Sequence, residues 1–171
     1  METTTPTTSP SAELRERLNG SPLVLMLDVD GTLAPIAPRP EEAVVPADTR
    51  RAIAALAARG PAVKVALVSG RAAADARRMV SVANLWVVGN HGAETIGPDG
   101  ETIVDPRVLP FRAALAAAAR QLAAAVAPVP GVAVENKTWS LTVHWRLADQ
   151  GIVPRLRALV EDVARRHGLA V

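Results

Sequence analysis

Two acidic residues at the end of an apolar run form the clearest chemical signal in the sequence. Residues 23–27 read Leu-Val-Leu-Met-Leu, and Asp28 and Asp30 follow. An uninterrupted apolar run predicts a strand buried on both faces, as in a parallel sheet. Residues two apart in an extended backbone point to the same side, so the two carboxylates would lie together. Paired carboxylates at the carboxyl end of such a strand can hold a hard cation where a phosphate docks.

Gly31 and Thr32 continue this segment as Asp-x-Asp-Gly-Thr-Leu. Gly31 allows a sharp turn, and Thr32 offers a hydroxyl and a backbone N–H to a phosphate. The alternative is that the aspartates only cap the turn, and a lone Asp-x-Asp favours that explanation. The longer motif directly after an apolar run favours chemistry.

A second candidate segment, Ser69-Gly70-Arg71, follows the apolar run at residues 63–68. A serine hydroxyl and the N–H groups at the start of the next helix would form a phosphate cradle. A strand followed by Ser-Gly is, taken alone, an ordinary strand-to-helix turn. Its position one strand after the aspartate pair favours the phosphate-binding interpretation.

Two further polar segments admit both a functional and a structural interpretation. Asn90 and His91 lie between glycines, where they would either bind sugar hydroxyls or form a solvated turn. Residues 135–146 predict a strand pair, and alternation places the polar residues of the second strand on one face. That face is either solvated or a surface that recognises a polyhydroxyl ligand. Its polar members, with those of the preceding strand, are Glu135, Lys137, Ser140, Thr142, His144 and Arg146.

The arrangement of predicted elements indicates an α/β protein. Strands at 23–27, 63–68 and 85–88 alternate with helices near 46–59 and 72–80, the pattern of a right-handed parallel layer. The later part predicts a hairpin at 94–104, helices at 110–126 and 153–167, and strands at 132–135 and 140–145. We therefore divide the chain into a disordered lead-in with a short helix (1–20), half of a Rossmann-like core (21–93) and an α+β cap (94–171).

Composition excludes several classes of function. The 171-residue chain has a net charge of +2 and no cysteine, which excludes disulfides and thiolate chemistry. Scattered basic residues and few aromatic residues give no signal for nucleic-acid binding. No signal peptide or membrane-spanning segment is predicted, and the expected location is the cytoplasm.

Taken together, these segments resemble the trehalose-6-phosphate phosphatases of the haloacid-dehalogenase-like superfamily. The resemblance implies a Rossmann-like core with an α+β cap, and Asp28 as nucleophile with Asp30 as general acid/base. It implies that Ser69, with Thr32 and Gly70, binds phosphate, and that Mg²⁺ is held by the carboxylate of Asp28 and the backbone carbonyl of Asp30. The substrate would be trehalose 6-phosphate. The implied sugar-binding residues are Arg71, Asn90, His91, Glu135, Lys137, Ser140, His144 and Arg146.

The chain also departs from this family pattern. The family has a later phosphate-binding lysine and a later acidic pair, whereas this chain has lysine only at positions 64 and 137. We therefore expect an incomplete core, an exposed edge at residues 23–27, and little or no activity from the chain alone. Two alternatives remain: a phosphatase for another sugar phosphate, such as a sucrose phosphate or mannosyl-phosphoglycerate, or a non-catalytic sugar-phosphate-binding module. Association with a trehalose-phosphate synthase is a further expectation.

Overall fold

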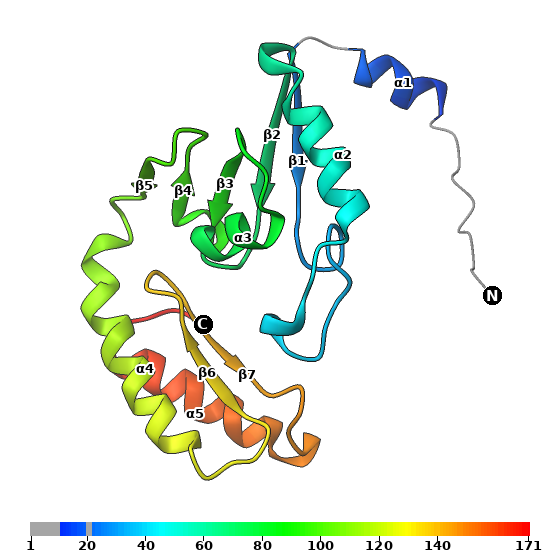
Figure 1. The fold of residues 1–171 in the computed structure, drawn as a ribbon. Helices are drawn as coiled ribbons and strands as arrows, with labels where there is room; N and C mark the ends of the chain where they lie inside the picture. The colour runs from blue at the N-terminus through cyan, green and yellow to red at the C-terminus, as the bar shows by residue number, and fades with distance from the viewer. Residues whose placement is uncertain (1–10, 20–21) are drawn as a thin grey trace, which may run out of the picture.

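A computed structural model describes residues 11–19 and 22–171 and contains two separate β-sheets (Figure 1). The predicted lead-in at residues 1–10 lies outside the described residues. The elements of the first half are α1 (Ala12–Leu18), β1 (Leu23–Leu27), α2 (Ala47–Ala57), β2 (Val63–Val68), α3 (Ala73–Val80) and β3 (Trp86–Gly89). Those of the second half are β4 (Glu94–Ile96), β5 (Thr102–Val104), α4 (Arg112–Val126), β6 (Ala133–Asn136), β7 (Leu141–His144) and α5 (Val153–Arg166).

The larger sheet has the strand order β1-β2-β3-β4-β5. Strands β1, β2 and β3 are parallel, which confirms the predicted α/β class. Alternate residues of these strands, including Val65, Leu67 and Val87, are buried together with residues of α2 and α3. Burial of this apolar face is the main force that holds the layer together.

The hairpin β4–β5 lies in this larger sheet, although the sequence-based division placed it with the cap. Strand β4 pairs antiparallel with β3, and β5 pairs with β4. A tight turn at Asn90–Gly92 returns the chain directly onto β3, and Ile96 is buried in the first core. The sheet of the core therefore extends through Val104.

The second unit packs helices α4 and α5 beside the two-stranded sheet β6–β7. Its core contains Ala118, Leu122 and Val163. The carboxyl ends of β1 and β2 point toward this hairpin, and in the described part of the chain only the segment between β5 and α4 connects the units covalently (Figure 1). None of the described helices is long and apolar enough to form a transmembrane span.

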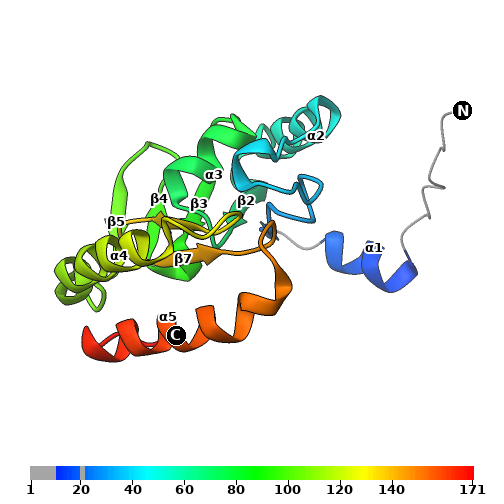
Figure 2. The same ribbon diagram turned by 90° about the horizontal axis from the view of Figure 1, so that it is seen from below.

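One face of the larger sheet remains exposed. Helices α2 and α3 lie on the same side of the strands (Figure 2). On the opposite face Val24 is 52% exposed and Met26 is 73% exposed, and Val68 and Trp86 are also exposed. Within the described residues, β1 pairs only with β2, which confirms the expected edge strand. An apolar face beside an unpaired edge favours self-association.

Met26→Lys is expected to reduce self-association, because it places a charge on this apolar face beside the edge strand. Sedimentation velocity over a concentration series would measure the effect. Val44→Lys is the matched control, since Val44 is exposed in the loop before α2 and lies outside the sheet. Equal association of the Met26→Lys variant and the unmodified chain would contradict the prediction.

Candidate active site

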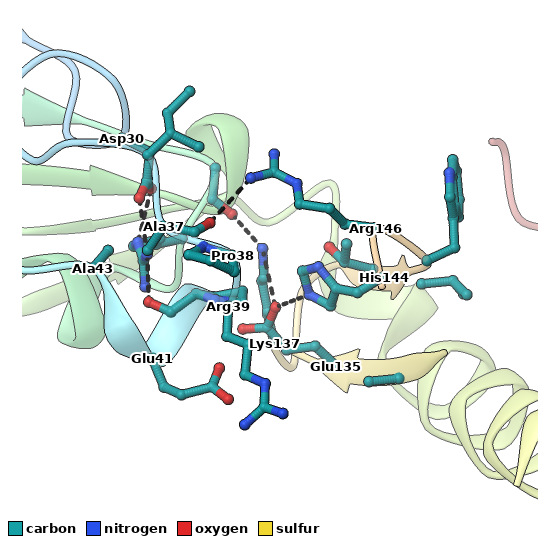
Figure 3. Close-up of a pocket in the computed structure, with 18 of the residues that line it drawn as sticks. Asp30, Ala37, Pro38, Arg39, Glu41, Ala43, Glu135, Lys137, His144 and Arg146 are labelled. Atoms are coloured by element: carbon teal, nitrogen blue, oxygen red, sulfur yellow. Dashed lines mark hydrogen bonds and ion pairs between the residues drawn. The ribbon is translucent and has the colours of Figure 1, made fainter. Parts of the chain in front are cut away.

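A cleft of about 1290 Å³ separates the carboxyl ends of β1 and β2 from the β6–β7 hairpin (Figure 3). The loop between β1 and α2, with its short 3₁₀ turn at Pro40–Glu42, forms one wall. Most of the predicted site residues line this cleft: Asp28, Asp30, Ser69, Gly70, Arg71, His91, Glu135, Lys137, His144 and Arg146.

Asp28 lies in the cleft at the end of β1, and its side chain is exposed. Within the part of the chain that the structure describes, its carboxylate makes no hydrogen bond or ion pair. The following turn is fixed by hydrogen bonds from the N–H groups of Leu33 and Ala34 to the carbonyl of Val29, and Val29 is completely buried. The Asp28 carboxylate is thus held on a rigid loop and is available to a ligand.

Asp30, by contrast, is bound by the buried side chain of Arg71. Arg71 Nε donates to Asp30 Oδ2 at 2.7 Å, and Nη2 donates to Oδ1 at 2.8 Å. Arg71 also donates to Asp75 Oδ2 at 2.9 Å and to the carbonyl of Pro40 at 2.8 Å. The hydrogen bonds from Arg71 to Asp30 raise the pKa of the Arg71 guanidinium above its usual value. A bidentate pair of this kind is strong and directional.

This ion pair bears on the role predicted for Asp30. Both of its carboxylate oxygens accept hydrogen bonds from Arg71. A general acid must present a proton to the leaving group. Each oxygen has a second lone pair beyond the one that Arg71 uses, so Asp30 keeps a position from which to contact a ligand.

Asp75 was absent from the predicted site, although it contacts Arg71 and lines the cleft. Arg71 lies two residues before α3 and Asp75 lies in the first turn of that helix, so helical spacing did not identify this contact. Burial raises the pKa of Asp75, but hydrogen bonds from Arg71 and Arg78 outweigh that effect and lower the pKa below its usual value.

Asp75 is therefore expected to stabilise the fold at neutral pH and to lose this effect in acid. A lowered folded-state pKa contributes stability above the ordinary aspartate pKa near 4, and the contribution disappears as the pH falls through the folded-state value. Asp75→Asn should show a weaker loss of stability below about pH 4 than the unmodified chain. Urea unfolding at pH 7 and at pH 3 measures this, with the exposed Asp99→Asn as control. An equal loss of stability between pH 7 and pH 3 in the Asp75→Asn variant and the unmodified chain would contradict the prediction.

The Ser69-Gly70 segment lies between the two units. Ser69 is buried, and its hydroxyl accepts a hydrogen bond from the N–H of Arg71 at 3.2 Å. A side chain on Gly70 would meet the His91 ring at 2.5 Å, so the close approach of His91 requires glycine. The predicted cradle at the start of α3 is partly occupied, because the N–H of Ala73 donates to Glu94 Oε1 at 2.8 Å.

The β6–β7 hairpin presents its polar side chains to the cleft, as Figure 3 shows. His144 Nε2 lies 2.8 Å from Glu135 Oε2, and Lys137 Nζ lies 3.7 Å from the same oxygen. Lys137 Nζ also donates to the carbonyl of Gly70 at 2.9 Å. Arg146 donates to the carbonyl of Ala37 at 3.0 Å. These contacts combine acceptors and donors of the kind that bind sugar hydroxyls.

Three predicted site residues do not line the cleft: Thr32, Asn90 and Ser140. Thr32 is exposed, whereas Asn90 and Ser140 are hydrogen-bonded to each other. The cleft also contains polar or aromatic residues that the motifs did not identify, because most come from segments without a recognisable pattern: Arg39, Glu41, Asp75, Arg78, Trp145 and Gln150.

The predicted magnesium site is supported only in part by the side chains present. Within the described residues, no group of three or more histidine or acidic side chains is arranged to hold a metal. The Asp28 carboxylate is available, and the contact of Arg71 with the Asp30 carboxylate leaves the predicted carbonyl ligand of Asp30 untouched. Mg²⁺ is often held by one or two carboxylates together with phosphate oxygens and water. Asp28 fits as the one carboxylate ligand of such an ion.

The sequence matches the family model for trehalose-phosphatase over residues 26–171. The chain belongs to the trehalose-phosphatase family. It is 35% identical over 147 residues to a trehalose-phosphate phosphatase of Mycobacterium tuberculosis (strain H37Rv), covering 86% of the chain and 37% of that relative. It is 38% identical over 160 residues to an uncharacterized glycosyl hydrolase of the same strain, covering 94% of the chain and 12% of that relative. The chain thus spans well under half the length of these curated relatives.

Solved structures show the same fold. The crystal structure of a trehalose-6-phosphate phosphatase related protein matches with a TM-score of 0.77 and 26% identity. The match covers 85% of the present chain and 61% of the related protein's chain. The C-terminal domain of the Candida albicans trehalose-6-phosphate phosphatase matches with a TM-score of 0.72 and 22% identity. The match covers 90% of the present chain and 53% of the Candida chain. The second match supports the fold alone.

Proposed function

We propose that this chain carries the nucleophile and the sugar-binding wall of a trehalose-6-phosphate phosphatase site. The observation that carries the proposal is the Asp28 carboxylate, unpaired within the described residues, in a cleft whose opposite wall is the polar β6–β7 hairpin. Family membership supports phosphate-ester hydrolysis as the reaction. The closest chemical fit for the ligand is a phosphorylated sugar, since the cleft offers both cationic groups and hydroxyl-binding groups.

In the proposed reaction, an oxygen of Asp28 attacks phosphorus and the bond from phosphorus to the sugar oxygen breaks. The leaving sugar oxygen takes up a proton, and water then hydrolyses the aspartyl-phosphate to release phosphate and restore Asp28. Asp30 would supply and later accept that proton. Bound Mg²⁺ would neutralise charge on the phosphate oxygens.

The remaining cleft residues would hold the substrate. The Ser69 hydroxyl and the Lys137 ammonium lie on the side of the cleft next to Gly70, where they would contact phosphate. Glu135, His144 and Arg146 would bind sugar hydroxyls from the opposite wall. His91 would contact the sugar at the junction of the two units.

A second candidate function is the binding of a sugar phosphate without turnover. One observation favours it: the Asp30 carboxylate is held by Arg71. The cationic side chains of the cleft would still hold a phosphate. Association with a trehalose-phosphate synthase remains a proposal for either function.

Because the sequence predicts little or no activity from the chain alone, phosphate release and ligand binding are measured on the chain extended by a core segment with the later lysine and acidic pair of the family. The two measurements on this extended chain separate the functions. Trehalose 6-phosphate, sucrose 6-phosphate and mannosyl-3-phosphoglycerate would be compared in the presence of Mg²⁺, with calorimetric titration alongside. Release that is fastest from trehalose 6-phosphate supports the main proposal, and preference for another sugar overturns the substrate. Binding of trehalose 6-phosphate with no release from any ester supports the second candidate. If the extended chain neither binds nor hydrolyses any of the three esters, both candidate functions are overturned.

A further inference from the structure

The buried side chain of Asn90 joins the two units of the molecule. Asn90 follows β3 and is 3% exposed. Its Nδ2 donates to Glu94 Oε1 at 2.7 Å and to the carbonyl of Lys137 at 3.1 Å. Its Oδ1 accepts from Ser140 Oγ at 2.6 Å. Both amide N–H groups and the carbonyl oxygen of the side chain are therefore used within the protein.

The partners of Asn90 on the second unit belong to the turn between β6 and β7. That turn is closed by a hydrogen bond from the N–H of Lys137 to the carbonyl of Ser140 at 3.0 Å. From this turn the Lys137 side chain reaches the carbonyl of Gly70, at 2.9 Å. The same turn, residues 137–140, thus makes the contact with Asn90 and places the Lys137 ammonium beside the Ser69-Gly70 segment.

Few residue types fit the position of Asn90. Its φ of 49° is in the left-handed region, where glycine, asparagine and aspartate are the residues usually found. The contacts also require a donor toward Lys137 and an acceptor toward Ser140, which a carboxylate cannot supply together. The N–H of Asn90 is held by the carbonyl of Arg71 at 2.7 Å, which fixes the side chain relative to the core.

We propose that Asn90 is a positioning residue that latches the β6–β7 turn onto the core and so sets the closed arrangement of the cleft. The catalytic consequence, delivery of Lys137 to the phosphate-binding side, rests on the proposed function. The latch itself does not, because it is a contact between two parts of this chain. Asn90 then acts through Lys137 and Ser140 and leaves ligand contact to the residues that line the cleft.

The experiment measures the distance between the two units. Because the chain has no cysteine, Ala54→Cys on α2 and Ala124→Cys on α4 give two unique, exposed sites for spin labels. Pulsed electron paramagnetic resonance would measure the distance between the two labels in this chain and in two variants. Asn90→Gly keeps the backbone conformation, and Asn90→Asp keeps the shape but loses both donors. Asn84→Gly is the matched control, since Asn84 is an exposed asparagine with a φ of 59°.

We expect one narrow distance in the labelled chain and in Asn84→Gly. Both Asn90 variants should show a second, broader population, with the ratio of closed to open forms lowered about tenfold or more by loss of the hydrogen bonds. Narrow, unchanged distances in folded Asn90 variants would overturn the proposal, as would a broad distribution in the unmodified labelled chain. If circular dichroism shows either variant unfolded, Ser140→Ala decides: an added broad population supports the latch, and an unchanged distance overturns it. No outcome depends on phosphatase activity.

Discussion

Asp28→Asn is expected to abolish phosphate release from trehalose 6-phosphate. The amide is a far weaker nucleophile than the carboxylate and cannot form the aspartyl-phosphate, so kcat/KM should fall by about 10³-fold or more. Asp28 is exposed in the cleft and unpaired within the described residues, so its replacement should leave the fold intact. Phosphate release by the extended chain at high protein concentration measures the loss, and urea unfolding checks the fold.

Asp99→Asn is the control for this variant, because Asp99 is an exposed acid in the turn between β4 and β5. In the extended chain it should leave the rate of phosphate release unchanged. Retention of more than a small part of the activity by Asp28→Asn would contradict the assignment of the nucleophile. If the chain extended by the later lysine and acidic pair releases no phosphate but binds the ester, the second candidate function gains support.

Among the variants proposed for this chain, Arg71→Ala is expected to cause the largest loss of stability. Arg71 is 8% exposed and holds two carboxylates and the carbonyl of Pro40. Its removal leaves the carboxylates of Asp30 and Asp75 without their buried partner. Breaking one side of a buried pair typically costs 3–5 kcal/mol, and partial exposure of Asp30 reduces our expectation to about 2–3 kcal/mol in the free energy of unfolding. Urea unfolding at pH 7 provides the measurement.

Two further variants test the cause of this loss. Arg71→Lys should recover little stability, because an ammonium cannot make the bidentate contact with Asp30 and also reach Asp75 and Pro40. Arg78→Ala is the matched control, since the Arg78 side chain contacts Asp75 from an exposed position and should contribute less than about 0.5 kcal/mol. Full recovery by lysine, or equal losses in the Arg71→Ala and Arg78→Ala variants, would refute the importance of the buried pair.

The bond between Arg71 and Asp30 also links stability to chemistry. In the arrangement observed, it fixes Asp30 at the cleft. Arg71 would then both stabilise the fold and hold Asp30 in place for its proposed role.

The local pattern of the sequence was sufficient for much of the fold. The apolar runs at residues 23–27 and 63–68 predicted parallel strands, and the structure confirms the parallel pairing of β1 with β2. The predicted burial of β1 on both faces is wrong, because none of the described helices covers the second face and Val24 and Met26 are exposed there. The spacing of apolar residues located α2, α3, α4 and α5 to within a few residues. Parallel strands bring their carboxyl ends to one edge of a sheet, so the sequence alone predicts that Asp28 and Ser69 lie near each other, and both line the cleft. Periodicity and motif spacing are properties of adjacent residues, and the sequence displays them directly.

Only the tertiary structure decided which side chains are partners. Asp30 meets Arg71 across 41 residues of sequence, and Asn90 meets Ser140 across 50. The pattern of the β4–β5 hairpin is compatible with either sheet, and its pairing with β3 assigns it to the core. Asn90 and Ser140 are polar residues in polar segments, and their types fit sugar binding as well as they fit a contact between units. Whether a polar group faces a ligand or another residue depends on what the folded chain places opposite it, and spacing along the sequence does not contain that information.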